Sequence, residues 1–460
     1  MHRFALDYLR QWKRRASRKP LVVRGARQVG KSHLVRMFAQ QEFQHLLEVN
    51  FERLPDAASL FKSNAPRTIC RLLEARFNTP LTPGPSLLFL DEIQAAPEVF
   101  AVLRYFREEL PDLHVIAAGS LLEFVLRDHH FSMPVGRVEY LHLGPMVFEE
   151  FLLAVGRDRL RDWLVQYGPG DEVPAEMHAE LSRLVRQYLV IGGMPEAVAA
   201  FGQTESYQEC EQIQQAVLAT YRDDFNKYGQ RVKQQRVEKV FARVPLMVGR
   251  KFMYSHVDRE ERSRDLGEAL SLLQLARVVH KVPHTHANGI PLAAEADDRT
   301  FKVLFMDVGL LCRSCGLRMT DLVQSDEPML INSGAVCEQA VGQHLLHATP
   351  FYVEPELFCW IRQTRGSNAE VDFVIGIGDQ VVPVEVKAGK TGTLKSLHVF
   401  LREKRRRFGL RFNMDRPSLL EAQTSVATGP QTQFQLLSLP LYLVGQTSRL
   451  CETVLRNKTD

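Results

Sequence analysis

Residues 25–32 read GARQVGKS, which sets glycine, lysine and serine at the spacing of a phosphate-binding loop. Glycines let backbone N–H groups turn towards phosphate oxygens, a lysine reaches the β- and γ-phosphates, and a hydroxyl binds Mg²⁺. The alternative is a glycine-rich turn without function. We expect an ATP site formed by Gly25, Ala26, Arg27, Gln28, Val29, Gly30, Lys31, Ser32 and His33.

Two carboxylates follow an apolar run at residues 86–90. Asp91, at the end of a strand, can hold Mg²⁺ together with Ser32. Glu92 can polarise the attacking water, a role that suits hydrolysis better than binding alone. By itself such a pair is only a strand leaving a core. Together with the loop at 25–32, it predicts an ATP-hydrolysing enzyme.

A third group of reactive residues lies near the C-terminus, where two strand-like runs are joined by a turn at 376–380. Asp372 is on the first run, and Glu385 and Lys387 on the second. Because side chains alternate along a strand, Glu385 and Lys387 point to one face. Two carboxylates that bind Mg²⁺, or Mn²⁺ in its place, and a lysine that orients water match the D…E-x-K core of restriction-endonuclease-like nucleases. The alternative is a half-exposed edge strand with one ion pair.

That nuclease core usually includes an acidic residue from a preceding helix, and Glu338 is placed to supply it. The catalytic set of this second centre would then be Glu338, Asp372, Glu385 and Lys387, with Asp372 and Glu385 as the metal ligands. The order along the chain, a helix first and the two strands afterwards, is the order that the nuclease fold requires.

The elements that position the first site alternate between strands and helices. An apolar run feeds the loop, and residues 31–38 continue it with helical spacing, so the phosphate would lie on a helix N-terminus. This alternation predicts an α/β fold, a parallel P-loop NTPase sheet covered by helices. The expected strands are 20–25, 46–51, 86–91, 114–119 and 138–143.

Several motifs together make the chain similar to AAA-type ATPases of archaea and bacteria that carry a C-terminal restriction-endonuclease-like domain of uncharacterised function. The motifs are GARQVGKS (25–32), VNFE (49–52), LDEIQ (90–94), AGS (118–120), PVGR (134–137), LGPMVFEEF (143–151) and IGGMPEA (191–197). The resemblance implies that Ser120 ends the strand that senses the γ-phosphate and belongs to the ATP site. It also implies that Arg137 is an arginine finger, often supplied by a neighbouring subunit. A surface turn is the other interpretation of Arg137, and both stay open.

The chain has 460 residues, and we expect four parts. These are an AAA-type ATPase core at 1–155, a helical lid at 156–228, a winged-helix-like domain at 229–322, and a restriction-endonuclease-like, PD-(D/E)xK domain at 323–460. In the third part, a helix at 262–275 would precede wing strands at 276–282 and 301–306. Acidic and basic residues balance on that helix, which favours a structural role over reading of DNA bases.

Composition excludes several classes of protein. The net charge is +4, so any nucleic-acid surface must be local, such as the basic stretch at 402–411, which could equally be a solvated helix face. Seven scattered cysteines form no disulfide framework and fit a reducing cytoplasm. Apolar runs fall well short of the ~18 residues of a membrane span, so we expect no membrane partner.

We therefore predict a cytoplasmic, homo-oligomeric hydrolase that uses ATP and Mg²⁺. Its fused nuclease-like domain would act on nucleic acid, DNA rather than RNA, with genome defence as a candidate pathway. The alternative is an ATPase switch whose C-terminal domain binds nucleic acid or protein without cleaving it. A third interpretation is an ATP-dependent interaction protein without any nucleic acid.

Overall fold

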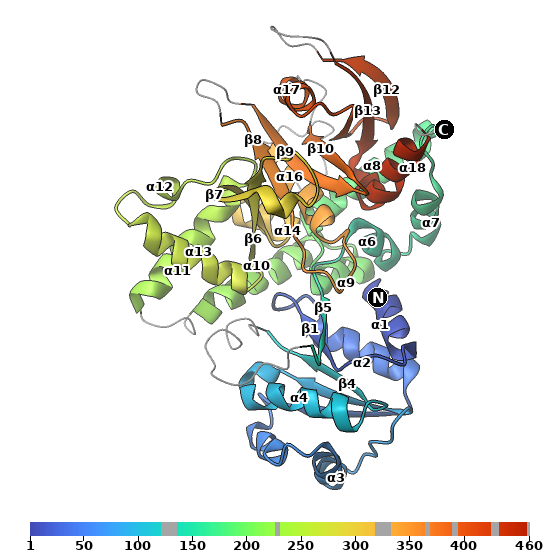
Figure 1. The fold of residues 1–460 in the computed structure, drawn as a ribbon, viewed down its shortest axis with the longest axis vertical. Coiled ribbons are helices and arrows are strands. Elements are labelled where there is room, and N and C mark those ends of the chain that lie inside the picture. The colour runs from blue at the N-terminus through green and yellow to red at the C-terminus, as the bar shows by residue number, and fades with distance from the viewer. Residues whose placement is uncertain are drawn as a thin grey trace. The chain divides into compact units, whose positions relative to one another are not determined.

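A computed structural model describes residues 1–120, 136–225, 231–317, 333–363, 369–388, 394–424 and 432–457. The chain divides into two compact units, and each is described by itself. The first unit contains Met1–Gly144 with Leu275–Val278 and Pro350–Glu354. The second contains Pro145–Gln274, Val279–Thr349 and Pro355–Asp460. Figure 1 labels most of their helices and strands.

The first unit is built around a five-stranded sheet. Its strands are β1 (Leu21–Arg24), β2 (His45–Asn50), β3 (Ser86–Asp91), β4 (His114–Ala118) and β5 (Glu139–His142). Its helices are α1 (Ala5–Arg14), α2 (Lys31–Glu42), α3 (Pro66–Phe77) and α4 (Pro97–Glu109), with short 3₁₀ turns η1 (Pro55–Phe61) and η2 (Ile93–Ala95). The strand order is β2-β3-β4-β1-β5, and every pair is parallel. The parallel sheet and its five strands confirm the expected α/β fold.

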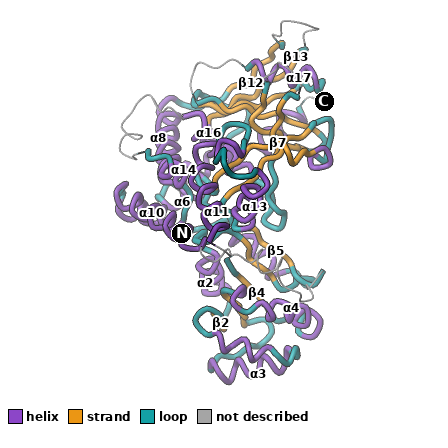
Figure 2. The backbone as a smooth tube through the Cα atoms, turned by 90° about the vertical axis from the view of Figure 1, so that its left-hand side faces the viewer, coloured by secondary structure: helices purple, strands orange, loops and turns teal. Residues whose placement is uncertain are grey.

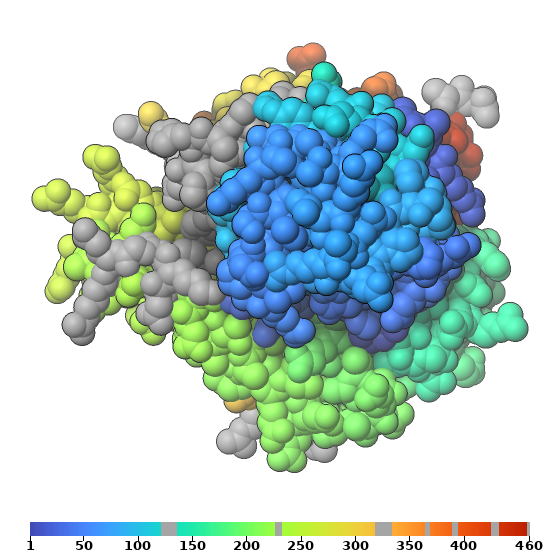
Figure 3. Space-filling view, turned by 90° about the horizontal axis from the view of Figure 1, so that it is seen from below, coloured from blue at the N-terminus to red at the C-terminus, as the bar shows by residue number. Residues whose placement is uncertain are grey.

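Helices cover both faces of this sheet, which is why its strands are continuous apolar runs. One face packs with α3 and α4 into a core whose strand members are Val22, Leu47, Val49, Leu88, Leu90, Val115 and Ala117. The alternate residues face the other way, where α2 lies against β2, β3 and β4 and Trp12 of α1 contacts His114 edge-on. In Figure 3 residues 1–120 of this unit, coloured blue to cyan, form one continuous surface.

The second unit begins with helices. They are α6 (Phe148–Ala154), α7 (Asp158–Gln166), α8 (Ala175–Ile191), α9 (Pro195–Thr204), α10 (Tyr207–Asp224), α11 (Arg231–Arg243), α12 (Tyr254–Val257) and α13 (Ser263–Leu275). Helices α14 (Val308–Ser314), α16 (Ser333–Leu346), α17 (Lys395–Glu403) and α18 (Thr447–Arg456) follow later in the chain, as do the 3₁₀ turns η4 (Val244–Met247), η5 (Leu292–Glu295) and η6 (Leu441–Gln446). Among the described residues, no helix is both long enough and apolar enough to cross a membrane.

An eight-stranded sheet forms the rest of the second unit (Figure 2). Its strands are β6 (Val279–Thr285), β7 (Ala296–Phe305), β8 (Phe358–Ile361), β9 (Glu370–Ile377), β10 (Gln380–Val386), β11 (Phe408–Asn413), β12 (Ser418–Gln423) and β13 (Gln433–Pro440). The order is β12-β13-β11-β10-β9-β8-β6-β7. Strands β9 and β10 are the antiparallel pair expected to carry Asp372 and Glu385.

The hairpin expected as a wing is present, because β6 and β7 pair antiparallel after helix α13. It does not stand alone, however. Strand β6 also pairs with β8, through His284 and Cys359, so the hairpin continues the sheet of the C-terminal strands. This continuity brings β7 into one layer with β9 and β10. The proposed division of the chain into four parts stays a prediction.

Two of the sequence motifs, LGPMVFEEF and IGGMPEA, contribute Met146 and Gly193 to the packing of the second unit. Gly193 O accepts from Met146 N over 2.7 Å, and a Cβ at Gly193 would overlap the Met146 backbone. Gly193 N donates to Asp307 Oδ2 over 2.6 Å, and Asp307 Oδ1 caps α14 by accepting from Leu310 N over 3.0 Å. Gly193 therefore lies where no side chain fits, and its backbone joins Met146 to Asp307 by hydrogen bonds.

Candidate functional site

The loop at 25–30 lies between β1 and α2, and its backbone needs glycine at two positions. Gly30, the N-cap of α2, has φ of 88°. Gly25 has φ of 154°, and a Cβ there would overlap Leu143 O. Gln28 is the one loop residue with a side chain in the left-handed region, at φ 64°. The turn therefore ends at the N-terminus of a twelve-residue helix, where the helix dipole favours an anion.

Lys31 is held against the loop that it follows. Its Nζ donates to Gly25 O over 3.0 Å and to Ala26 O over 2.7 Å, and the side chain is buried. The ammonium thus lies within the turn of the loop rather than in solvent. Of the other predicted contacts, Ala26 and Val29 are buried, whereas Gln28 and His33 are exposed.

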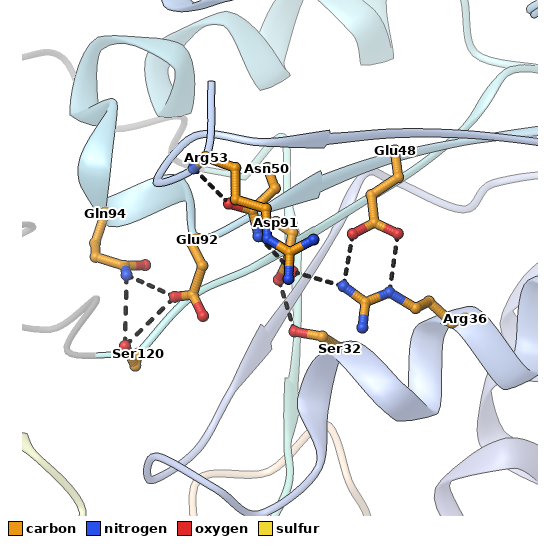
Figure 4. A network of polar contacts seen from close by, with 9 residues as sticks. All are labelled: Ser32, Arg36, Glu48, Asn50, Arg53, Asp91, Glu92, Gln94 and Ser120. Atoms are coloured by element: carbon orange, nitrogen blue, oxygen red, sulfur yellow. Dashed lines mark hydrogen bonds and ion pairs between the residues drawn. The ribbon is translucent and has the colours of Figure 1, made fainter. Parts of the chain in front are cut away.

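Ser32, in the first turn of α2, and Asp91, at the end of β3, lie beside each other (Figure 4). Ser32 Oγ donates to Asp91 Oδ1 over 2.7 Å. The other carboxylate oxygen, Oδ2, accepts from Asn50 Nδ2 over 3.1 Å and lies 3.4 Å from Arg36 Nη2. Asp91 is 2% exposed, and this burial raises its pKa, while the hydrogen bond from Ser32 opposes the rise. The carboxylate is therefore fixed by donors at both oxygens.

Arg36 forms a two-pronged ion pair with Glu48, in which Nε and Nη2 donate to the two carboxylate oxygens over 2.9 and 2.7 Å. This pair orients the guanidinium that faces Asp91. The sequence analysis assigned no role to Arg36, Glu48 or Asn50. Asn50 belongs to the VNFE motif, and Arg36 follows Ser32 by one helical turn, so the motif and the spacing offered a reason to consider both as site residues.

Glu92, Gln94 and Ser120 form a second polar group at the ends of β3 and β4, which are neighbours in the sheet (Figure 4). Gln94 Nε2 donates to Glu92 Oε2 over 2.6 Å. Ser120 Oγ lies 3.4 Å from both Gln94 Nε2 and Glu92 Oε2. The structure therefore brings the expected water-orienting glutamate and the expected γ-phosphate sensor together. Gln94 was missed, although it ends the LDEIQ motif.

The side chain of Arg137 contacts a residue outside these two polar groups. Its Nε donates to Glu108 Oε1 over 2.9 Å, and the side chain is 53% exposed. Pro134 and Val135 of the same motif lie outside the described residues. An exposed arginine with one surface partner fits both earlier interpretations, a finger for a neighbouring subunit and a turn residue.

The C-terminal residues also converge. Asp372 on β9 and Glu385 on β10 lie across from each other, because the register that pairs Phe373 with Val384 continues by one residue. Asp372 Oδ2 accepts from Val386 N over 2.8 Å. Glu385 Oε1 lies 2.6 Å from Lys387 Nζ. The predicted acid, acid and lysine thus share one face of the β9–β10 hairpin.

Two further residues, Lys302 and Glu370, lie beside these side chains, and the sequence analysis assigned a role to neither. Lys302 of β7 extends its Nζ to Glu338 of α16, to Glu370 Oε1 at 2.7 Å and to Asp372 Oδ1 at 3.2 Å. We call Glu338, Glu370, Asp372 and Glu385 the carboxylate cluster. Burial, against the pull of Lys302, raises the pKa of Glu338 to about 8. Burial and the nearby Asp372 raise the pKa of Glu385 to about 7.

Comparison with known proteins bears on the first site. Residues 17–152 match the family model described as an AAA domain. We call these residues the AAA domain. Residues 182–321 and 333–427 match two models described as domains of unknown function (DUF8612 and DUF4143). No curated protein sequence matches the chain.

Solved structures with some likeness include a Walker-type ATPase of Pyrococcus abyssi, at 15% identity over 67% of this chain and 94% of that one, with a TM-score of 0.43. The ORC2 protein of Aeropyrum pernix is 13% identical over 70% and 92%, with a TM-score of 0.33. The RuvB Holliday junction branch migration motor of Thermotoga maritima is 14% identical over 61% and 88%, with a TM-score of 0.27. Likenesses this distant transfer no function, so none is drawn from them.

The AAA domain fits a magnesium ion by the chemistry of its donors. A hydroxyl and a buried carboxylate, Ser32 and Asp91, lie within hydrogen-bond distance of each other directly after the phosphate loop. Oxygen donors of this kind are what Mg²⁺ prefers, and one or two side chains suffice when phosphate oxygens complete the shell.

The carboxylate cluster fits a metal ion less well. An ammonium, Lys302 Nζ, already pairs with Glu338, Glu370 and Asp372, the carboxylates that an ion would need. In the part of the chain that the structure describes, no group of three or more His, Cys, Asp or Glu side chains is arranged to hold a metal ion. The predicted residues are therefore together, but a lysine lies among them.

Proposed function

We propose that the AAA domain binds ATP with Mg²⁺ and hydrolyses it. The observation that carries the proposal is the hydrogen bond from Ser32 to the buried Asp91, because it joins a phosphate loop to a strand-end carboxylate. When bound there, Mg²⁺ would neutralise charge on the β- and γ-phosphates. Lys31 would exchange its contacts with Gly25 O and Ala26 O for phosphate oxygens, which are stronger, charged acceptors.

In the same proposal, Glu92 orients the water that attacks the γ-phosphorus. Gln94 holds one carboxylate oxygen of Glu92, which leaves the other, Oε1, to accept a proton from that water. Ser120, at the end of β4, lies beside Glu92 and would report whether a γ-phosphate is present. Hydrolysis then needs both the loop and the polar group at the ends of β3 and β4.

Asp91→Asn tests this proposal. The amide keeps the size of the side chain but removes the charge that would hold Mg²⁺, so Mg²⁺-dependent ATP turnover should fall ~10²-fold or more. Ser32→Ala should have a similar effect. Ser59→Ala is the matched control, since Ser59 Oγ donates to the backbone of η1 and should leave turnover unchanged. Full turnover by Asp91→Asn would contradict the assignment.

Assembly and partners belong to this proposal as well. We propose that the protein acts as a homo-oligomer in which Arg137 contacts the nucleotide of a neighbouring subunit, and that the driven process involves nucleic acid, DNA rather than RNA. The exposure of Arg137 and the basic turn after α17 support this proposal. Two side chains of that turn, Lys404 and Arg406, contact Asn288 over 2.9 and 2.6 Å.

We consider two functions for the second unit. One is Mg²⁺- or Mn²⁺-dependent cleavage of nucleic acid by Glu338, Asp372, Glu385 and Lys387. The other is a module that binds nucleic acid or protein without cleaving it. The ion pairs of Lys302 favour the second, because they neutralise carboxylates that a metal-dependent nuclease must offer to its ion.

A cleavage assay separates these two functions. The purified protein would be incubated with plasmid, linear and single-stranded DNA, with and without ATP, in Mg²⁺ or Mn²⁺. The binding module predicts intact substrates under every condition. Cleavage that disappears in both Asp372→Ala and Glu385→Ala, while ATP turnover persists, would establish the nuclease instead.

A further inference from the structure

Lys302 is the most deeply buried ammonium of the second unit's described ion pairs, with 1% of its side chain exposed. It lies on β7, opposite Val282 of β6. Its three carboxylate partners come from different elements, Glu338 from α16 and Glu370 and Asp372 from β9. An ammonium group has three N–H donors and no acceptor. Three carboxylates therefore satisfy it completely.

The charge on this lysine is stable where it lies. Burial opposes a charged ammonium, yet the surrounding Glu338, Asp372 and Glu370 raise the pKa of Lys302 well above its usual value. A buried charge is tolerated in proteins only when it is paired in this way. The lysine and the three carboxylates thus depend on one another.

The same three carboxylates and Glu385 are the oxygens that a divalent ion would need. Asp372 accepts at both oxygens, at Oδ1 from Lys302 Nζ and at Oδ2 from Val386 N. Glu385 has one oxygen paired with Lys387, while its Oε2 is buried and accepts no hydrogen bond in the described structure. Mg²⁺ and Mn²⁺ bind through several oxygens, and one oxygen each of Glu338, Glu370 and Asp372 is already paired with the ammonium of Lys302.

We propose that Lys302 occupies the cation position of the carboxylate cluster, so that the chain's own ammonium serves as its counter-ion in place of a divalent metal ion. This inference is independent of ATP hydrolysis by the AAA domain. It is also separate from what the second unit acts on, because it concerns only what neutralises the cluster. A metal ion and the Lys302 ammonium exclude each other there, since two cations would share the same oxygens.

Removing the lysine should therefore create a metal site. Lys302→Met keeps most of the side-chain volume and an unbranched shape but removes the charge. The protein would be nucleotide-free and would carry Asp91→Asn, which removes the charge of the AAA domain's proposed metal ligand. Mn²⁺ binding would be measured as the loss of the paramagnetic resonance signal of free Mn²⁺. Lys302→Met should bind Mn²⁺ at least ten times more tightly than the same protein with Lys302, and its melting temperature should rise with added Mn²⁺.

Two controls define the site. Lys281→Met makes the same replacement on the adjacent strand, where the lysine pairs with the exposed Asp298 at 3.6 Å, and should gain no Mn²⁺ binding. Adding Asp372→Asn to Lys302→Met should abolish the gain. A folded Lys302→Met protein without tighter binding would overturn the proposal.

A measurement with Lys302 in place covers the case in which Lys302→Met does not fold. Mn²⁺ titrations of the Asp91→Asn protein, with and without Asp372→Asn, should coincide, because the cluster binds no metal while Lys302 is present. Mn²⁺ binding that is lost on Asp372→Asn would show that the metal enters despite the lysine, and the proposal would then be wrong.

Discussion

Gln94 donates from Nε2 to Glu92 Oε2 over 2.6 Å, and Glu92 itself stands in the left-handed region with φ of 52°. A glutamate at the end of a buried strand could rotate freely into solvent. Here the amide of Gln94 selects one orientation. The water-orienting residue of the proposed mechanism is therefore positioned by a neighbour two residues away, which itself need not touch the nucleotide.

Gln94→Ala should lower kcat for ATP roughly ten-fold and change KM less than two-fold, because Glu92 loses its orientation while the phosphate loop is untouched. Steady-state ATP hydrolysis measures both constants. Ser120→Ala removes only the longer 3.4 Å contacts with Glu92 and Gln94 and should cost less by this route. A larger effect on KM than on kcat would place Gln94 in nucleotide binding instead.

Arg137→Ala should retain ATP affinity and lose turnover if Arg137 is a finger between subunits. Mixing it with Lys31→Ala should then restore part of the activity, since each protein supplies what the other lacks at a shared interface. Glu108→Ala is the control, because it breaks the surface ion pair without removing the arginine, and such pairs contribute little to stability. If the mixture gains nothing although both proteins assemble, the finger between subunits is excluded.

The raised pKa values of the cluster predict a pH dependence of stability. The folded protein holds a proton on Glu338 up to a pKa of about 8, whereas the unfolded chain releases it near 4.5. The folded state therefore binds more protons across this window, and its free energy of unfolding falls as pH rises from about 4.5 to 8. Glu338→Gln lacks this group, so the wild type should lose stability relative to the variant over that range.

Denaturant unfolding at several pH values measures this difference. Glu354→Gln, which replaces an exposed carboxylate that pairs with Arg277, is the control and should track the wild type. A constant stability difference between the wild type and Glu338→Gln from pH 5 to 8 would mean that Glu338 is ionised throughout and would contradict this prediction.

Asp307→Ala should destabilise the second unit by roughly 2 kcal/mol, because it leaves the buried N–H groups of Gly193 and Leu310 without their acceptor. Thermal unfolding provides the measurement. Asp298→Ala, at an exposed position of β7, should change the melting temperature little. Equal effects of the two replacements would show that the hydrogen bonds of Asp307 do not hold the second unit together.

Much of the first unit could be predicted from sequence. Buried parallel strands are short apolar runs, and the run at 86–91 corresponds to β3 residue for residue. The loop at 25–32 and the pair Asp91–Glu92 follow such strands directly, so their place at the carboxyl edge followed from the pattern. Arg36 and Glu48 were not predicted, because an arginine on a helix or a glutamate on a strand can equally be an ordinary solvent-exposed side chain.

The C-terminal cluster shows the limit more clearly. Alternation along β9 and β10 was enough to place Asp372, Glu385 and Lys387 on one face. Lys302 is a single charge in the apolar run Phe301–Phe305, and its partners are 36 to 70 residues further along the chain. Only the continuation of the β6–β7 hairpin into the C-terminal sheet brings it there, and periodicity carries no information about which strands become neighbours.

The central claim, that the AAA domain hydrolyses ATP through Lys31 and Glu92, is tested most directly by measuring ATP affinity and turnover together in Lys31→Ala and Glu92→Gln. Lys31 lies in the phosphate loop, so its replacement should weaken ATP binding. Glu92 acts on water, so Glu92→Gln should bind ATP as the wild type does but turn it over ~10²-fold or more slowly. Undiminished hydrolysis by Glu92→Gln, or unchanged ATP affinity in Lys31→Ala, would contradict the account.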